Sequence, residues 1–194
     1  MKGNEYILKN DYAEIIIDSK KYGDIRVKVD IEDINRCKEI TWHYSNSRDI
    51  PYICGKVKNK NIKLHRYLLN LNDKRYVVDH INRNSLDNRK SNLRIADYQE
   101  NSFNRSLRCD NSSGFAGINY NKVTNKWRAK IRYNNIDIHL GYFKDINEAL
   151  INRTLAEEYL FKDFKPTRDC ILISNEIVNK AKINVAERIY NKVS

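Results

Sequence analysis

Apolar and polar residues alternate with a period of two along several short segments of the N-terminal third, the pattern of half-buried β-strands. The clearest case is 25–31, where apolar residues alternate with charged ones. The polar residues at 58–60 separate two further alternating segments and predict a hairpin. We therefore expect a β-rich N-terminal segment. Its predicted strands are 6–8, 13–17, 25–31, 51–57 and 61–64, and its predicted helices are 31–40 and 64–71.

The middle of the chain is organised around a polar loop. Short apolar segments at 77–78 and 93–95 predict two strands, and the turn-forming residues between them, 82–92, predict the loop. Asp97 followed by Glu100 matches a capping box, which predicts that a helix begins directly after the second strand. The sequence therefore predicts a strand–loop–strand–helix unit that can fold its polar side chains around one point.

The C-terminal half predicts a second, separate sheet. Segments 118–121, 127–133 and 136–140 alternate apolar and polar residues, and Asn134-Asn135 predicts a tight turn between the last two. A helix capped by Asp145 follows, with apolar residues at helical spacing. One face of the sheet is apolar, so we expect the helix to cover it.

Charge and cysteine usage narrow the class of protein. The chain of 194 residues carries 36 Lys+Arg against 25 Asp+Glu, a net charge of +11, and this balance favours a polyanionic partner through counterion release. The length suits two small domains. The four cysteines form no CxxC pair, so no zinc site or disulfide framework is evident, and a reducing cytoplasm is expected. We find no signal peptide and no apolar run that could span a membrane.

Four polar residues of the middle unit have the chemistry for phosphodiester hydrolysis. Asp79-His80 ends the first strand, Asn92 ends the loop, and Asn101 lies in the first turns of the helix. An imidazole with a pKa of about 6.5 can take a proton from water at neutral pH. Carboxylate and amide oxygens are ligands for Mg²⁺, and Mn²⁺ is expected to substitute. The alternative for a lone Asp-His pair is that Asp and Asn only form turns around a buried histidine.

The same segment resembles the HNH endonucleases, and more narrowly the homing-type HNH nucleases of phages and mobile introns. The matching motifs are Asp79-His80, Asp87-Asn88-Arg89, Ser91 to Arg94 and Gln99-Glu100-Asn101. The resemblance implies a ββα-metal fold with His80 as general base, Asp79 and Asn101 as metal ligands, and Asn92 holding the loop and orienting His80. Leu64-His65-Arg66 also fits the family, and we interpret His65 as structural rather than catalytic.

The outward face of the second sheet is the candidate surface for double-stranded DNA. A polar sheet face is commonly only solvated, but three basic residues flanked by amides favour a DNA groove, because Arg can bond guanine and Asn adenine. Arg105, before the sheet, is a further candidate contact. The candidate residues of the face are Asn119, Asn121, Arg128, Lys130, Arg132 and His139.

This second block resembles the AP2 DNA-binding domain. Gly117-Ile118, Trp127 to Arg132 and Leu140 to Phe143 match its pattern, and a helix containing several alanines follows. The resemblance implies a three-stranded antiparallel sheet in the major groove. Ala116 and Asn119 replace basic first-strand residues of the plant members, so their base preference does not transfer.

The C-terminal tail begins where Pro166 breaks the preceding helix. Residues 171–173 predict a short strand, and Asn175 is a candidate cap for a helix that runs to Lys192. We expect this helix to pack onto the body of the protein, and an additional DNA-contacting or dimer-forming helix is the alternative.

The sequence thus predicts an α+β protein with three parts: a β-rich scaffold and HNH unit in 1–108 with its motif in 76–105, an AP2-like domain in 112–163, and a helical tail in 164–194. The expected activity is a Mg²⁺-dependent, site-directed DNA endonuclease of homing type that nicks as a monomer in a bacterial or phage-infected cell. The alternatives are a dimeric HNH restriction endonuclease and a non-catalytic DNA-binding regulator. Monomer and homodimer both remain open.

Overall fold

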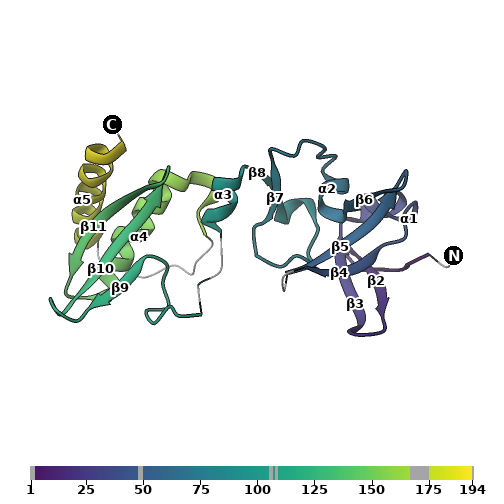
Figure 1. Cartoon of the computed structure of the whole chain (residues 1–194), viewed down its shortest axis with the longest axis horizontal. Helices are drawn as coiled ribbons and strands as arrows, with labels where there is room; N and C mark the ends of the chain where they lie inside the picture. Colours follow the sequence, from purple (N-terminus) through teal and green to yellow (C-terminus); the bar gives the residue numbers. More distant parts are fainter. Residues whose placement is uncertain (1–2, 48–49, 105–106, 108, 167–174, 194) are drawn as a thin grey trace. The chain divides into compact units, whose positions relative to one another are not determined.

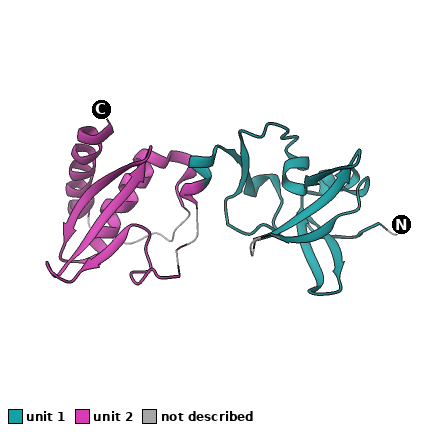
Figure 2. Ribbon diagram, viewed as in Figure 1, with its two compact units in different colours: residues 1–101 teal, residues 102–194 magenta. Residues whose placement is uncertain are grey.

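The computed structural model describes residues 3–47, 50–104, 107, 109–166 and 175–193, and within them the protein is α+β with several small antiparallel sheets. The chain forms two compact units, 1–101 and 102–194, which we call unit 1 and unit 2 (Figure 2). The sequence placed the boundary after residue 108, whereas the units meet at Asn101 and Ser102, and unit 2 includes the tail helix.

Unit 1 contains two three-stranded sheets and one two-stranded ladder (Figure 1). The strand orders are β1-β2-β3, β4-β5-β6 and β7-β8. The strands are β1 (Glu5–Leu8), β2 (Ala13–Ser19), β3 (Gly23–Val29), β4 (His43–Ser47), β5 (Ile50–Val57), β6 (Lys60–Lys63), β7 (Val77–His80) and β8 (Leu93–Ala96). The helices are η1 (Ile31–Asp33), α1 (Ile34–Lys38), α2 (Leu64–Leu68), η2 (Lys90–Asn92) and α3 (Tyr98–Phe103), the last continuing into unit 2.

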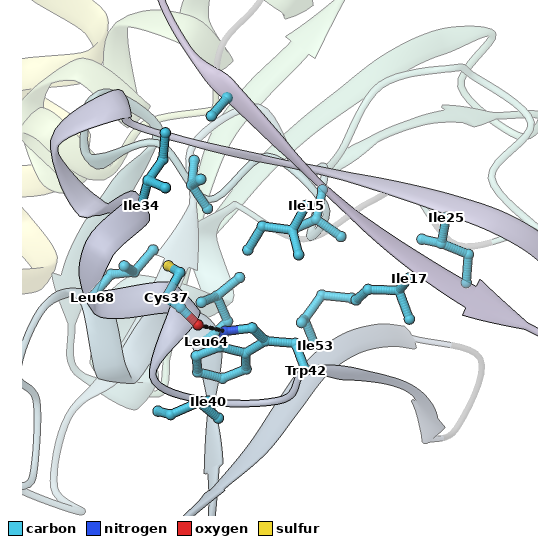
Figure 3. Packing of buried hydrophobic residues seen from close by; sticks show 13 residues of the cluster. Ile15, Ile17, Ile25, Ile34, Cys37, Ile40, Trp42, Ile53, Leu64 and Leu68 are labelled. Carbon is cyan, nitrogen blue, oxygen red and sulfur yellow. Dashed lines mark hydrogen bonds between the residues drawn. The ribbon is translucent and has the colours of Figure 1, made fainter. Parts of the chain in front are cut away.

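The core of unit 1 forms where the alternating residues of β2 and β3 turn inward. Figure 3 shows Ile15, Ile17 and Ile25 in one cluster with the indole of Trp42. The indole Nε1 donates to the carbonyl of Cys37 at 2.9 Å, which satisfies the polar atom of this buried ring. The strand β4, which begins directly after Trp42, was not predicted, because its sequence HYSNS has no apolar alternation.

The edge of β3 supports the polar loop between β7 and β8. The Lys28 N–H donates to the carbonyl of Leu86, and the Asn88 N–H donates to the carbonyl of Lys28, both at 2.8 Å. Farther along, the Lys90 N–H donates to the Asp30 carboxylate at 2.7 Å, and the Lys90 ammonium pairs with Asp33 at 3.0 Å. The N-terminal sheet therefore holds the loop in place through backbone pairing.

Unit 2 is an antiparallel sheet of order β11-β10-β9 with helices packed against it. The apolar residues of the strands form one core with those of α4, as the alternation predicted. Asn134 and Asn135 adopt φ of 48° and 63°, the left-handed values of a tight hairpin turn. The elements are β9 (Ile118–Asn121), β10 (Lys126–Tyr133), β11 (Ile136–Phe143), α4 (Ile146–Phe161), η3 (Lys162–Phe164) and α5 (Asn175–Val193).

The tail helix α5 packs against α4 and the edge strand β11 (Figure 1). Val185 and Ile189 are buried in the core of unit 2. The Asn184 amide donates to the carbonyl of Leu140 at 2.9 Å and to the Asn152 side chain at 2.6 Å, so it bonds a backbone group of the edge strand. The predicted strand at 171–173 lies outside the described residues.

A β-bulge interrupts the pairing of β10 with β11. Ala129 pairs with Gly141 and Lys130 with His139, so Leu140 of β11 is the extra residue, and on the other side of β10 the Lys130 N–H donates to the carbonyl of Gly117 at 2.9 Å. Arg153 of α4 donates to the Lys130 carbonyl at 2.7 Å and pairs with Glu157 of the same helix at 2.8 Å, so a buried, ion-paired arginine ties α4 to β10. None of the helices among the described residues is both long and apolar enough to cross a membrane.

Candidate functional site

The two-stranded ladder of unit 1 brings the first pair of candidate residues together. Asp79 and His80 are the last residues of β7, and they lie opposite Arg94 and Leu93 of β8. Both are buried, with 7% and 8% of their surface exposed. Burying a carboxylate and an imidazole at the end of a strand costs free energy unless hydrogen bonds or ion pairs offset the loss of water.

Arg94 compensates the charge of Asp79. Its Nη2 and Nε lie 2.7 Å and 2.8 Å from the Asp79 Oδ2. The sequence identified Arg94 only as part of the SNLR motif. Its cross-strand position opposite Asp79 follows from the register of β7 and β8, which the sequence pattern alone does not give.

Asn92 clamps the two ends of the polar loop. Its amide oxygen accepts from the Asn82 N–H at 2.9 Å, and its amide nitrogen donates to the carbonyl of Asp87 at 2.8 Å. Its own carbonyl accepts from the Ile81 N–H at 2.9 Å. One buried side chain therefore fixes the backbone directly after His80 and the backbone at the far side of the loop.

Asp87 and Asn88 form the inner side of the same loop. Asp87 is 3% exposed, pairs with Arg89 at 2.7 Å, and accepts from the Asn82 side chain at 3.1 Å. Asn88 is 1% exposed, and its amide nitrogen donates to the carbonyl of Ser85 at 3.1 Å. The DNR motif therefore has a structural role in this loop.

The protonation of His80 is set by its surroundings. Burial lowers the pKa of His80 below its ordinary value. Asn88, Asp79 and Asp87 oppose this by raising the pKa, and the Lys63 ammonium adds to the lowering. The net direction is downward, so the imidazole is neutral at pH 7 and able to accept a proton.

A second wall of the site comes from β5, β6 and α2. His65 is 5% exposed, and its ring lies edge-on to that of His80 with centroids 5.3 Å apart and planes at 88°. The Tyr52 ring packs on His65 at 5.7 Å, and the Lys63 ammonium lies 3.4 Å from the centre of the Tyr52 ring. The sequence identified His65 through the LHR motif, but Tyr52 and Lys63 carried no recognisable pattern.

The remaining candidate metal ligand, Asn101, lies on α3. The reciprocal bonds between Asp97 and Glu100, both 2.8 Å, confirm the predicted capping box and fix the start of this helix. The Asn101 N–H donates to the carbonyl of Asp97 at 3.1 Å, so Asn101 lies in the first turn of α3. The described residues contain no cluster of three or more His, Cys, Asp or Glu that could hold a metal ion.

The candidate DNA-binding face in unit 2 is the surface of the sheet away from α4. In register, Arg128 lies between Asn119 of β9 and Tyr142 of β11, and Lys130 lies opposite His139. The sequence missed Tyr142, which is 45% exposed and contacts the His139 ring edge-on. The bulge at Leu140 shifts Tyr142 away from simple alternation with the buried residues Ile138 and Leu140.

Other residues modify this face. Arg132 lies opposite Asp137, which also pairs with Lys130 at 3.5 Å, so one carboxylate lies among the cations. The Asn121 amide oxygen accepts from the N–H groups of the β9–β10 turn at 2.9 Å and 3.2 Å, which gives this residue a turn-forming role. Arg105 lies outside the described residues.

Two known proteins are similar to parts of this chain. One, from Acanthamoeba polyphaga mimivirus, is 32% identical over 130 residues, which cover 63% of this chain and 64% of that protein. It is named an uncharacterized HNH endonuclease, L560. The other, Protein 3.8 of Escherichia phage T7, is 38% identical over 58 residues, 30% of this chain and 48% of that protein.

The chain covers less than two thirds of the length of each of these relatives. No protein-family model matches the sequence, and no solved structure matches it. The name of L560 agrees with the HNH resemblance of the sequence, and the name of neither relative supports the AP2 resemblance.

Proposed function

We propose that this protein is a divalent-metal-dependent DNA endonuclease of the HNH type. The observation that carries the proposal is the buried, neutral His80 at the end of β7, adjacent to Asp79, with the following loop clamped by Asn92. The similarity to a protein named an HNH endonuclease supports the same assignment.

In this proposal His80 acts as the general base. Its lowered pKa keeps the imidazole unprotonated at neutral pH, so it can take a proton from the attacking water. Asn92 acts through the backbone, because its two bonds hold Asn82 and Asp87 on either side of the loop that follows His80. A general base must be held within hydrogen-bond reach of the water, and a clamped loop provides that rigidity.

The donor set fits a hard divalent cation. Asp79 offers a carboxylate and Asn101 an amide oxygen, and Mg²⁺ commonly takes one or two protein ligands together with water and phosphate oxygens. When bound, the ion would stabilise the charge that develops on the phosphate and the leaving oxygen. Arg94 holds the Asp79 Oδ2 from across the ladder and thereby orients the carboxylate.

Unit 2 is proposed to choose the DNA site. Its sheet presents Arg128, Lys130 and Arg132 on the side away from α4, with Asn119 and His139 in register beside them. This AP2-like surface would lie in the major groove, where Arg and Asn can distinguish base edges. One nuclease unit and one dissimilar binding unit in the same chain suit a homing-type enzyme that nicks a long asymmetric target.

The decisive test uses supercoiled plasmid incubated with Mg²⁺, with Mn²⁺ or with EDTA. We expect metal-dependent conversion to the nicked form, and we expect His80→Ala to slow it by about 10²–10⁴-fold without weakening DNA binding. His43→Ala, which removes an exposed imidazole from β4, is the matched control and should cleave normally. DNA binding with no cleavage under any metal would instead support a non-catalytic DNA-binding regulator.

A further inference from the structure

Lys63 occupies an unusual position in unit 1. It is the last residue of β6 and directly precedes α2, which carries His65. Its side chain is half-buried, and its ammonium lies over the Tyr52 ring at 3.4 Å from the centre. A cation over an aromatic face is attracted by the ring quadrupole, so Tyr52 fixes the direction of this side chain.

The charge of Lys63 is not balanced by a carboxylate. Among the residues that the structure describes, no Asp or Glu lies within 4.0 Å of its ammonium. Cys54, its cross-strand partner, supplies no negative charge, because burial raises the pKa of the thiol. Partial burial lowers the pKa of Lys63 below its ordinary value, so the surroundings of its ammonium group disfavour the charged form.

The other cations around the candidate site are already committed. Arg94 pairs with Asp79 at 2.7 Å, and Arg89 pairs with Asp87 at 2.7 Å. Arg66 donates to the backbone carbonyls of Tyr76 and Asp73, at 2.8 Å and 2.7 Å. Within the described part of unit 1, Lys63 is thus a cation at this site that is held in direction by an aromatic ring and engages neither a carboxylate nor a backbone carbonyl.

Lys63 lies on the wall of the site that carries His65, and His65 faces the proposed base. The Lys63 ammonium lies over the Tyr52 ring, that ring packs on His65 with centroids 5.7 Å apart, and the His65 ring lies 5.3 Å from that of His80. An anion bound near His80 would therefore also interact with Lys63. In the proposed reaction that anion is the phosphodiester, whose non-bridging oxygens gain negative charge in the transition state.

We propose that Lys63 is a phosphate-binding residue of the nuclease site and bonds a non-bridging oxygen of the scissile phosphodiester. The inference rests on the proposed function and adds to it a cation from outside the HNH motif. Lys63 donates a charge-assisted hydrogen bond that strengthens as the oxygen becomes more negative. Tyr52 holds the ammonium in place, so little side-chain entropy is lost when the phosphate binds.

The test measures single-turnover cleavage of a duplex that contains the nick site mapped with the wild-type protein. Lys63→Met keeps the length of the side chain and removes the charge, and it should slow cleavage by about 10²-fold, the usual effect of losing one transition-state donor. Lys63→Arg keeps the charge and should stay within about fivefold of wild type. The matched control is Lys60→Met, an exposed lysine at the other end of β6, which should change the rate less than about twofold.

A sulfur substitution distinguishes phosphate contact from support of the fold. Replacing the contacted non-bridging oxygen by sulfur should slow the wild-type protein, and this slowing should largely disappear in Lys63→Met, because the contact is already lost. A general structural defect would slow cleavage of both substrates alike, so the ratio of the oxygen-substrate rate to the sulfur-substrate rate would be the same in Lys63→Met as in the wild-type protein. If Lys63→Met fails to fold, Lys63→Gln is judged by the same ratio.

The outcomes separate this inference from the proposed function. If the wild-type protein cleaves the duplex and Lys63→Met cleaves it at the same rate, the role of Lys63 is overturned and the nuclease assignment stays intact. A sulfur effect that persists undiminished in Lys63→Met overturns it as well. Plasmid that stays intact with the wild-type protein under every metal overturns both.

Discussion

At the scale of single residues, burial rather than ion pairing determines the state of the two histidines in unit 1. His65 and His80 face each other edge-on, and burial is the largest cause of the lowered pKa of each. Two cations at this distance would repel each other, so the arrangement is compatible with neutral rings. Both rings are therefore neutral at pH 7, which leaves His80 unprotonated for its proposed role as base and fits a structural role for His65.

This environment predicts a pH-dependent stability for unit 1. Burial lowers the pKa of His65 to about 3, whereas the unfolded chain takes up a proton near its ordinary value of about 6.5. The contribution of neutral His65 to the stability of the folded state is complete above pH 6.5, and it is lost as the pH falls from 6.5 toward 3. We expect the free energy of unfolding to fall by about 2 kcal/mol between pH 7 and pH 5, and His65→Phe to reduce that slope.

The free energy of unfolding at each pH is measured by the fluorescence of Trp42 during urea unfolding. A Trp127→Phe background removes the other of the two tryptophans in the chain. His43→Phe, at an exposed position of β4, is the control and should keep the slope. An unchanged slope in His65→Phe would show that this imidazole is accessible to protons in the folded protein.

Asn92 provides a second prediction at this scale. Asn92→Ala removes the bonds to Asn82 and Asp87 and leaves the buried carbonyl of Asp87 without this partner, at a cost of about 1–3 kcal/mol. We expect a slower nicking rate with an unchanged Mg²⁺ concentration for half-maximal activity. Asn84→Ala, at a more exposed bond of the same loop, should have a smaller effect. A shift in the metal requirement of Asn92→Ala alone would contradict the separate roles given to Asn92 and Asn101.

At the scale of elements, the parts that the sequence predicted are those set by local chemistry. The capping box of Asp97 and Glu100, the turn at Asn134-Asn135 and the amphipathic strands of both units depend on neighbouring residues. The strand β4, the bulge between β10 and β11 and the ion pair of Arg94 with Asp79 depend on contacts between distant segments. Periodicity contains no information on such contacts, so the candidate residues were predicted by residue type, and of the second wall only His65 was found.

The close approach of β10 to Gly117 gives a prediction for one glycine. Gly117 has φ of +71°, and a Cβ there would overlap the Lys130 carbonyl and approach the guanidinium of Arg153. Gly117→Ala should therefore destabilise unit 2 through both backbone strain and the loss of this close approach. The matched control is Gly114→Ala, where φ is +76° but no atom lies within 4 Å of the added Cβ.

Thermal unfolding of the two variants separates the two causes. Gly114→Ala reports the cost of the left-handed backbone, about 1 kcal/mol, and Gly117→Ala should cost at least about 1–2 kcal/mol more. Equal losses would mean that the backbone of β10 at Lys130 readily shifts away from Gly117.

At the scale of the whole molecule, the two compact units divide the proposed function. The proposed base and its supporting residues lie within 1–101, and the basic sheet lies within 102–194. The helix α5 adds to the second unit a part that the AP2 resemblance does not include. Burial lowers the pKa of His139, and the charges of Arg188 on α5 and of Arg128 add to this lowering. The sequence predicted the helix and its packing, and it gave a DNA-contacting or dimer-forming helix as the alternative.

The division predicts that the sheet sets site preference and leaves the chemistry unchanged. Arg128→Ala combined with Arg132→Ala should reduce discrimination between the native site and unrelated DNA, by about 1–3 kcal/mol for each base-edge contact that is lost. Cleavage at saturating protein should keep its metal dependence, because Asp79, His80 and Asn101 are untouched. Lys122→Ala, an exposed cation in the β9–β10 turn, is the control and should at most weaken binding to all sequences alike.

The measurement is sequencing of nick positions in a randomised DNA library, together with the salt dependence of binding. A double variant that nicks the native site with undiminished preference would place specificity in unit 1, and the sheet would then serve only to hold DNA through its phosphates.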